Sequence, residues 1–112
     1  MVKKNSPRNA VPEELGTDVV FEKAAELFRV MSAPMRLRII SALCSDEKNV
    51  GELLSEIDTT QPNMSQHLNT LYKAGVLRKR RDGVQIYYAI ANEDVAAICR
   101  TVCVRVAANS PN

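Results

Sequence analysis

The chain has 112 residues, of which 46% are hydrophobic and 25% are charged, and its net charge is +2. This length predicts one domain with a modest core, and small domains often gain stability by dimerising. No apolar stretch approaches the roughly 18 residues of a membrane span, and the N-terminus has no apolar signal segment. The three cysteines are an odd number, which does not suit a secreted disulfide framework. We therefore expect a cytoplasmic protein with reduced thiols and no membrane partner.

The N-terminal part predicts a polar arm followed by two helices. Residues 1–16 contain two prolines and a glycine, a composition that is typical of a flexible arm. Apolar residues then recur at helical spacing over about 18–32, and a second helix over about 34–45 begins with a proline. In this second helix, Arg36 and Arg38 are expected to face outward.

The middle of the chain predicts two further helices. The polar segment 45–49 is typical of a turn, and helices follow at about 50–57 and 61–74. Thr60 is a suitable N-cap for the second of these helices, because its hydroxyl can accept from a backbone N–H of the first turn. Gly75 suits the left-handed position that ends it.

After Gly75 the pattern changes to alternation, with strands expected at about 76–80 and 85–90. Asp82-Gly83 between them predicts a hairpin turn. A last helix is expected at about 92–107, although its many β-branched residues favour helix only when packing supports them. The folded domain would therefore span 17–108, followed by a short tail, 109–112.

Two helices joined by a short turn and followed by a basic hairpin predict a winged helix-turn-helix. The fold class is mainly α with a β-hairpin wing, in the order α-α-α-α-β-β-α. In such folds the second helix of the pair enters the major groove, where Asn and Gln match adenine and Ser suits several bases. The segment 73–81 carries five Lys and Arg residues and no acid, which favours DNA over a merely solvated surface. The expected contacts to double-stranded DNA are Gln61, Asn63, Ser65, Gln66, His67, Asn69 and Lys73 of the helix, and Arg80 and Arg81 of the wing.

Catalysis is not expected, because the chain has no Ser-His-acid or metal-ligand constellation. His67 is the only histidine. Its position on the predicted reading helix favours a structural role or a phosphate contact, since nothing nearby completes a set of metal ligands.

Specific segments resemble the ArsR-type (ArsR/SmtB) bacterial winged-helix transcriptional repressors. These are "LFRVMSAPMRLRIISAL" and "VGELLSEIDTTQPNMSQHLNTLYKAGVLRKRRDGVQIYYAI", and the resemblance covers about residues 18–107. Within them, "TQPNMSQHL" resembles the family's recognition helix and "GVLRKRRDGVQIYY" its wing. The resemblance implies a homodimer joined through the first and last helices, an inverted-repeat operator, and repression that an inducer releases.

The apolar stripes of the first and last helices exceed what one small core needs. We expect them to meet in the homodimer. The residues expected at this interface are Val95, Ile98, Val102 and Val106 of the last helix, with Val20, Leu27 and Phe28 of the first.

The family's usual arsenic site has cysteines at the start of the third helix and its zinc site has histidines on the last helix, and this chain has neither. A thiol-based subset instead senses reactive sulfur or oxidants through one cysteine on the second helix and one on the last. Cys44 and Cys103 resemble that layout, each offset by about one turn. The resemblance therefore implies a repressor released by a thiol-reactive inducer, with Cys99 as a spare thiol.

Three alternatives remain open from the residues. Cys44, Cys99 and Cys103 could together bind As(III) or a soft metal ion as inducer, because soft ions prefer thiolate ligands. The cysteines could instead be inert, since free cysteine packs like a small hydrophobe. The regulator could also work without a small inducer. No resident cofactor is expected in any of these cases.

Overall fold

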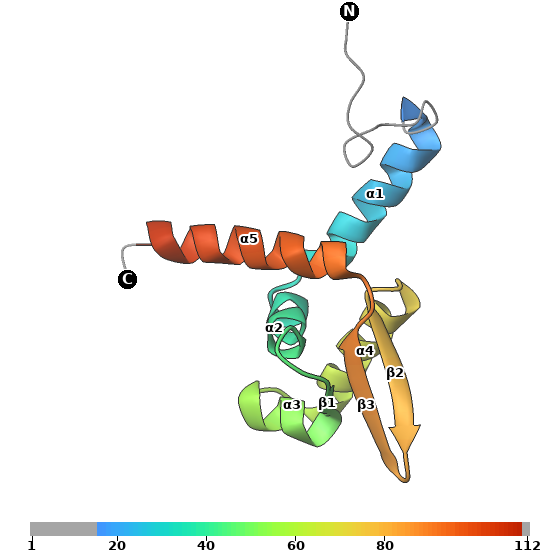
Figure 1. Cartoon of the computed structure of the whole chain (residues 1–112), viewed down its shortest axis with the longest axis vertical. Coiled ribbons are helices and arrows are strands. Elements are labelled where there is room, and N and C mark those ends of the chain that lie inside the picture. The colour runs from blue at the N-terminus through green and yellow to red at the C-terminus, as the bar shows by residue number, and fades with distance from the viewer. Residues whose placement is uncertain (1–15, 111–112) are drawn as a thin grey trace, which may run out of the picture.

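The structure, a computed structural model, describes residues 16–110, and its architecture confirms the predicted winged helix-turn-helix. The predicted arm lies almost entirely outside these residues. Figure 1 shows the elements α1 (Asp18–Met31), α2 (Pro34–Leu43), β1 (Lys48–Asn49), α3 (Val50–Glu56), α4 (Gln61–Lys73), β2 (Leu77–Asp82), β3 (Gln85–Ile90) and α5 (Glu93–Asn109).

Side-chain caps define where the helices begin. The hydroxyl of Thr17 accepts from the backbone N–H of Val20 at 3.4 Å, and that of Thr60 accepts from Asn63 at 3.2 Å. The Thr60 cap agrees with the sequence prediction. At the start of α3, Asn49 and Glu52 form a capping box, in which each side chain accepts from the other residue's backbone N–H.

The sheet differs from the prediction at two places. Residues 45–49 were expected to form only a turn, but Lys48–Asn49 is a short strand that pairs with β3, giving the strand order β1-β3-β2. A strand of two residues is too short to show alternation in the sequence. It forms because the edge of β3 offers unpaired backbone groups. The hairpin is also longer than expected: Asp82 pairs with Gln85, so the turn is Gly83-Val84, with Gly83 at φ +66°.

The core lies where α2 meets its neighbours, since α2 contacts α1, α4, α5 and β3. Ile39 and Ile40 of α2 and Leu53 of α3 are fully buried there. The buried face of α4 consists of Met64, Leu68 and Leu71, each with no exposed surface. This packing fixes how α4 is presented to solvent.

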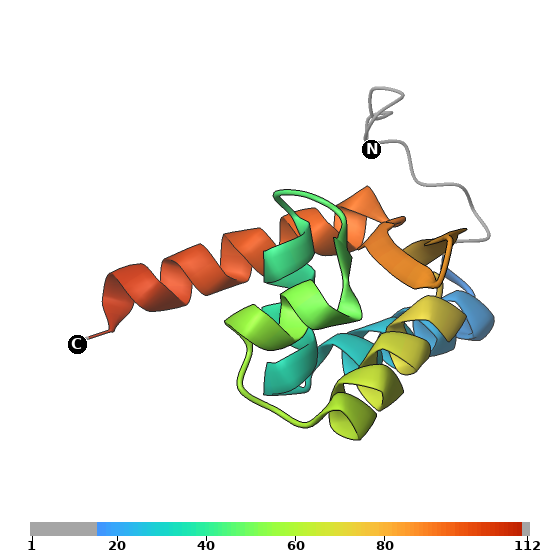
Figure 2. The same ribbon diagram turned by 90° about the horizontal axis from the view of Figure 1, so that it is seen from below.

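The other two long helices are only partly covered. Figures 1 and 2 show the C-terminal half of α5 extending beyond α2, with no other element beside it. Exposed apolar side chains are Val19 (57%), Phe21 (62%) and Phe28 (57%) on α1, and Ile98 (40%), Val102 (54%), Val104 (62%) and Val106 (61%) on α5.

One residue assigned to the dimer interface from the sequence was placed wrongly. Val95 is only 1% exposed and belongs to the chain's own core. Leu27 is half-buried against the same core. The helical spacing was correct, but spacing alone cannot distinguish a stripe that meets its own chain from one that meets solvent.

Candidate DNA-binding surface and thiol pocket

The outer side of α4 presents polar side chains to solvent. Gln61, Ser65, Gln66 and Asn69 are exposed, as is Lys73 in the last turn. Within residues 16–110 their side chains make no hydrogen bond, because the buried apolar stripe holds them away from the core. Such groups are available to a groove of DNA, where amides and hydroxyls can match base edges.

Asn63 and His67 are different, since both are half-buried at the edge of the helix. The Asn63 amide nitrogen donates to the hydroxyl of Thr59 at 2.8 Å. His67 Nδ1 lies 3.1 Å from a guanidinium nitrogen of Arg36. Of the residues predicted to touch DNA on α4, these two are therefore already engaged within the chain.

The expected outward position of Arg36 was wrong, whereas Arg38 is exposed as expected. Arg36 is half-buried and its Nε donates to the carbonyl of Val30 at 2.6 Å. Helical periodicity misplaced it because an arginine can bury its stem while its charged end finds polar partners on other elements.

The two predicted wing arginines lie on opposite faces of the hairpin. Lys79 Nζ lies 4.3 Å from the ring centre of Tyr72, a residue of α4. Because side chains alternate along a strand, Arg81 lies on the same face as Lys79. Arg80 lies on the other face. The wing therefore offers Arg81, rather than both arginines, on the side of α4.

Arg80 forms an ion pair with Glu47, from the loop before β1. Its Nε lies 3.0 Å from one carboxylate oxygen of Glu47, and a terminal nitrogen lies 2.6 Å from the other. Its guanidinium carbon is also 4.6 Å from the ring centre of Tyr87. The hydrogen bond from Arg80 holds the pKa of the Glu47 carboxyl below its usual range. A phosphate would have to compete with this carboxylate for Arg80.

On the side of α2 that faces α5, the three cysteines line one pocket. The pocket has a volume of about 390 Å³. Cys44 lies at the end of α2 and is exposed, Cys99 is buried, and Cys103 is exposed. The sulfurs of Cys99 and Cys103 are 3.9 Å apart. The remaining lining residues are Ser41, Ser45, Arg100 and Val104.

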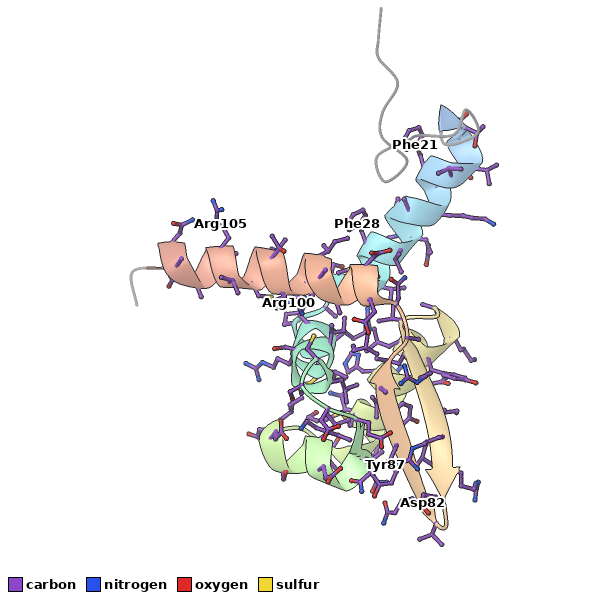
Figure 3. All side chains as sticks on the ribbon, viewed as in Figure 1. Phe21, Phe28, Asp82, Tyr87, Arg100 and Arg105 are labelled. Carbon is purple, nitrogen blue, oxygen red and sulfur yellow. The ribbon has the colours of Figure 1, made fainter. Side chains whose placement is uncertain are left out.

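Arg100 is the cation of this pocket. A terminal nitrogen of its guanidinium lies 3.8 Å from the sulfur of Cys44. Figure 3 shows Arg100 on the side of α5 toward α2, whereas Arg105, the other arginine near the cysteines in sequence, projects from the opposite side. The fold thus places Arg100 and not Arg105 in the pocket, a difference that sequence spacing alone did not indicate.

Cys99 is the buried thiol of the pocket. Burial, together with the hydrogen bond to Cys103, raises the pKa of Cys99 to about 11. Cys99 is therefore a protonated thiol at neutral pH, and the attacking group of any thiol chemistry is a thiolate. The two exposed cysteines are the accessible sulfurs of the pocket.

Residues 16–110 contain neither a metal-binding cluster of side chains nor a membrane-spanning helix. No group of three or more His, Cys, Asp or Glu side chains in this range is arranged to hold a metal ion, so the three cysteines share a pocket without forming such a group. No helix in the range is long and apolar enough to cross a membrane.

Comparison with known proteins identifies the family. Residues 33–79 match the sequence family described as "Bacterial regulatory protein, arsR family". The HTH-type transcriptional regulator Rv0081 of Mycobacterium tuberculosis is 38% identical over 94 residues, covering 80% of this chain and 82% of that protein. The crystal structure of Rv0081 superposes with a TM-score of 0.71, covering 83% of this chain and 97% of that chain.

Two further solved structures are similar. The transcriptional repressor BigR from Xylella fastidiosa is 28% identical with a TM-score of 0.72, covering 82% of this chain and 91% of its own. The homodimeric winged helix-turn-helix domain of Mb0332 from Mycobacterium bovis is 27% identical with a TM-score of 0.71, covering 80% and 86%. The chain belongs to the ArsR family of bacterial regulatory proteins. It is a DNA-binding transcriptional regulator and not an enzyme.

Proposed function

We propose that this protein is a homodimeric repressor that binds an inverted-repeat operator and is released by a thiol-reactive inducer, either reactive sulfur or an oxidant. We infer the class of inducer from the pocket between α2 and α5, where two exposed cysteines and one arginine lie together. Repression is supported by the likeness to BigR, a transcriptional repressor.

A homodimer is supported by the uncovered apolar faces of α1 and α5. Large apolar patches on a small soluble domain usually mark an interface. Phe21 and Phe28 both project from α1 on the side toward α5 (Figure 3), and Mb0332 is homodimeric. The second copy would cover these residues together with Val102 and Val106, and two reading helices would then meet two half-sites of the operator.

In the proposed complex, α4 reads bases and the wing contacts the backbone. Gln66 and Ser65 are exposed on α4 and suit base edges. Arg81 lies on the α4 side of the wing and suits phosphate or the minor groove. Arg80 would join it only after leaving Glu47.

The proposed switch joins Cys44 to Cys103. With a polysulfide, the Cys44 thiolate attacks a sulfur atom and the shorter polysulfide leaves, which makes Cys44 a persulfide. The Cys103 thiolate then attacks its inner sulfur and releases hydrosulfide, giving a disulfide. With peroxide, Cys44 becomes a sulfenic acid as one water leaves, and Cys103 displaces the second. Each route transfers two electrons from the thiols to the inducer.

A bond between α2 and α5 can reach the DNA-binding surface because α2 also contacts α4. Cys44 is the C-cap of α2, so pulling it toward α5 would bias the position of the whole helix. A coupling of about 1–3 kcal/mol would change operator affinity about 5–150-fold, which is enough to switch a promoter.

The experiment compares operator binding by gel shift before and after treatment with sodium tetrasulfide, peroxide or As(III). Cys44→Ser and Cys103→Ser should each keep DNA binding and lose the response, whereas the matched variant Cys99→Ser should keep both. Mass spectrometry of the treated wild type should find a peptide that links Cys44 to Cys103.

A link between Cys99 and Cys103, or a response that survives in Cys44→Ser, would contradict the proposed pair. A response to As(III) alone would favour the soft-metal alternative. If the variant without all three cysteines still responds like the wild type, the regulator works without a thiol inducer.

A further inference from the structure

Arg36 connects two helices that are far apart in the sequence. It lies in the first turn of α2, and its Nε donates to the carbonyl of Val30 near the C-terminal end of α1, at 2.6 Å. Its terminal nitrogen is 3.1 Å from Nδ1 of His67 on α4. One half-buried guanidinium therefore links a helix of the proposed dimer interface to the reading helix.

The contact determines the state of the imidazole ring. A guanidinium only donates hydrogen bonds, so His67 Nδ1 must accept, and the ring proton is then on Nε2. A protonated ring would place N–H against N–H and two positive charges side by side. Burial and the charge of Arg36 both lower the pKa of His67, consistent with a neutral ring.

We infer that Arg36 is a positioning residue for DNA recognition: it holds His67 as the Nε2–H tautomer and thereby makes the ring a hydrogen-bond donor for a DNA phosphate. Phosphate oxygens only accept, so the other tautomer would turn a lone pair toward them. This inference rests on the proposed DNA-binding surface of α4, and Arg36 itself need not touch DNA.

The tautomer can be measured in the protein without DNA. His67 is the only histidine of the chain, so ¹⁵N NMR of the imidazole reports one ring. The wild type should show a single neutral form with the proton on Nε2. Arg36→Met should give a mixture of tautomers, and the pKa of His67 should rise because a neighbouring positive charge has been removed.

Arg38→Met is the matched control, because Arg38 is exposed on the same helix and its loss changes the net charge equally. It should leave the ring spectrum unchanged. A wild-type ring with its proton on Nδ1, or an Arg36→Met ring identical to the wild type, would overturn the inference whether or not the protein binds the proposed operator.

The effect on DNA is read from a double-mutant cycle with His67→Ala. Arg36→Met should weaken operator binding several-fold, with about tenfold as the upper limit, because that limit is the complete loss of one hydrogen bond to a charged group and a mixture of tautomers keeps part of the donor. The same change in a His67→Ala background should have no further effect, because the donor is already gone. Fully additive losses would assign Arg36 a structural role only.

Two conservative replacements of His67 separate the two ring nitrogens. His67→Asn keeps an acceptor near Nδ1 but lacks a donor at Nε2, whereas His67→Gln can place an amide N–H near Nε2. The glutamine variant should bind the operator more tightly than the asparagine variant, and the reverse order would contradict the donor role. Circular dichroism of every variant, with Arg36→Lys included, separates a lost contact from a lost fold.

Discussion

The helices α4 and α5 differ in how far their own chain buries their apolar residues. In α4 the residues Met64, Leu68 and Leu71 have no exposed surface, and the exposed side is polar. In α5 only the first turns are covered, while Val102 remains 54% exposed and Val106 remains 61% exposed. Contacts within one chain thus bury the apolar side of α4, but they leave apolar residues in the second half of α5 exposed.

This difference indicates a division of labour. The orientation of α4 depends on contacts within one chain, so each protomer can present its polar side by itself. The exposed half of α5 has apolar area to bury, and burial of such area is the main force in protein association. The spacing between two reading helices would then be decided by α5 and α1, which is where an inducer can act.

The largest effect is expected from a charge in the uncovered half of α5. Val102→Asp would bury an unpaired charge in the dimer and should weaken association by about 3–5 kcal/mol. Sedimentation velocity should show that the Val102→Asp variant is a monomer at micromolar concentration. Thr101→Asp adds the same charge at the next position and serves as the control. A wild type that is monomeric at this concentration would contradict the comparison.

In α4, a change at a buried apolar residue should affect the stability of the fold and not the association of two chains. Leu68→Ala removes a fully buried side chain and should lower the free energy of unfolding by about 2–5 kcal/mol. Urea denaturation measures this loss. Val84→Ala, at a residue 92% exposed in the wing turn, should change stability by less than about 0.5 kcal/mol. Equal losses from the two variants would argue against the packing described for α4.

On the DNA-binding surface, substitutions in α4 and in the wing should change DNA binding in different ways. Gln66→Ala should cost about 1–3 kcal/mol at the cognate operator and relax the sequence preference there. Arg81→Ala should weaken cognate and random DNA alike and reduce the salt slope by about one unit. Fluorescence anisotropy over a range of salt concentrations separates the two. If both variants lose specificity equally, the proposed division between base and backbone contacts is wrong.

The smallest effect is expected at the ion pair between Glu47 and Arg80. Glu47→Gln should free the guanidinium for phosphate and slightly strengthen binding to random DNA at low salt, with the gain vanishing at high salt. Glu22→Gln, on the exposed side of α1, removes the same charge far from the wing. Weaker DNA binding by Glu47→Gln than by Glu22→Gln would mean that Glu47 positions Arg80 for DNA.

The sequence by itself was enough for most features that depend on neighbours along the chain, although the hairpin turn and the short strand β1 were not among them. The Thr60 cap, the glycine at the end of α4 and the change from helical spacing to alternation are all local signals, and each agrees with the structure. The polar side of α4 also followed from the sequence, since a buried stripe at i, i+4 and i+7 leaves the opposite side exposed.

Tertiary structure alone decided the contacts between elements. Arg36 meets His67 across 31 positions, Arg80 meets Glu47 across 33, and Arg100 meets Cys44 across 56. Periodicity places a side chain on one side of its own helix or strand, but it does not say which element lies beside it. Long, flexible arginines add to this, because each can choose among several acceptors within reach and only the packed fold determines which one is present.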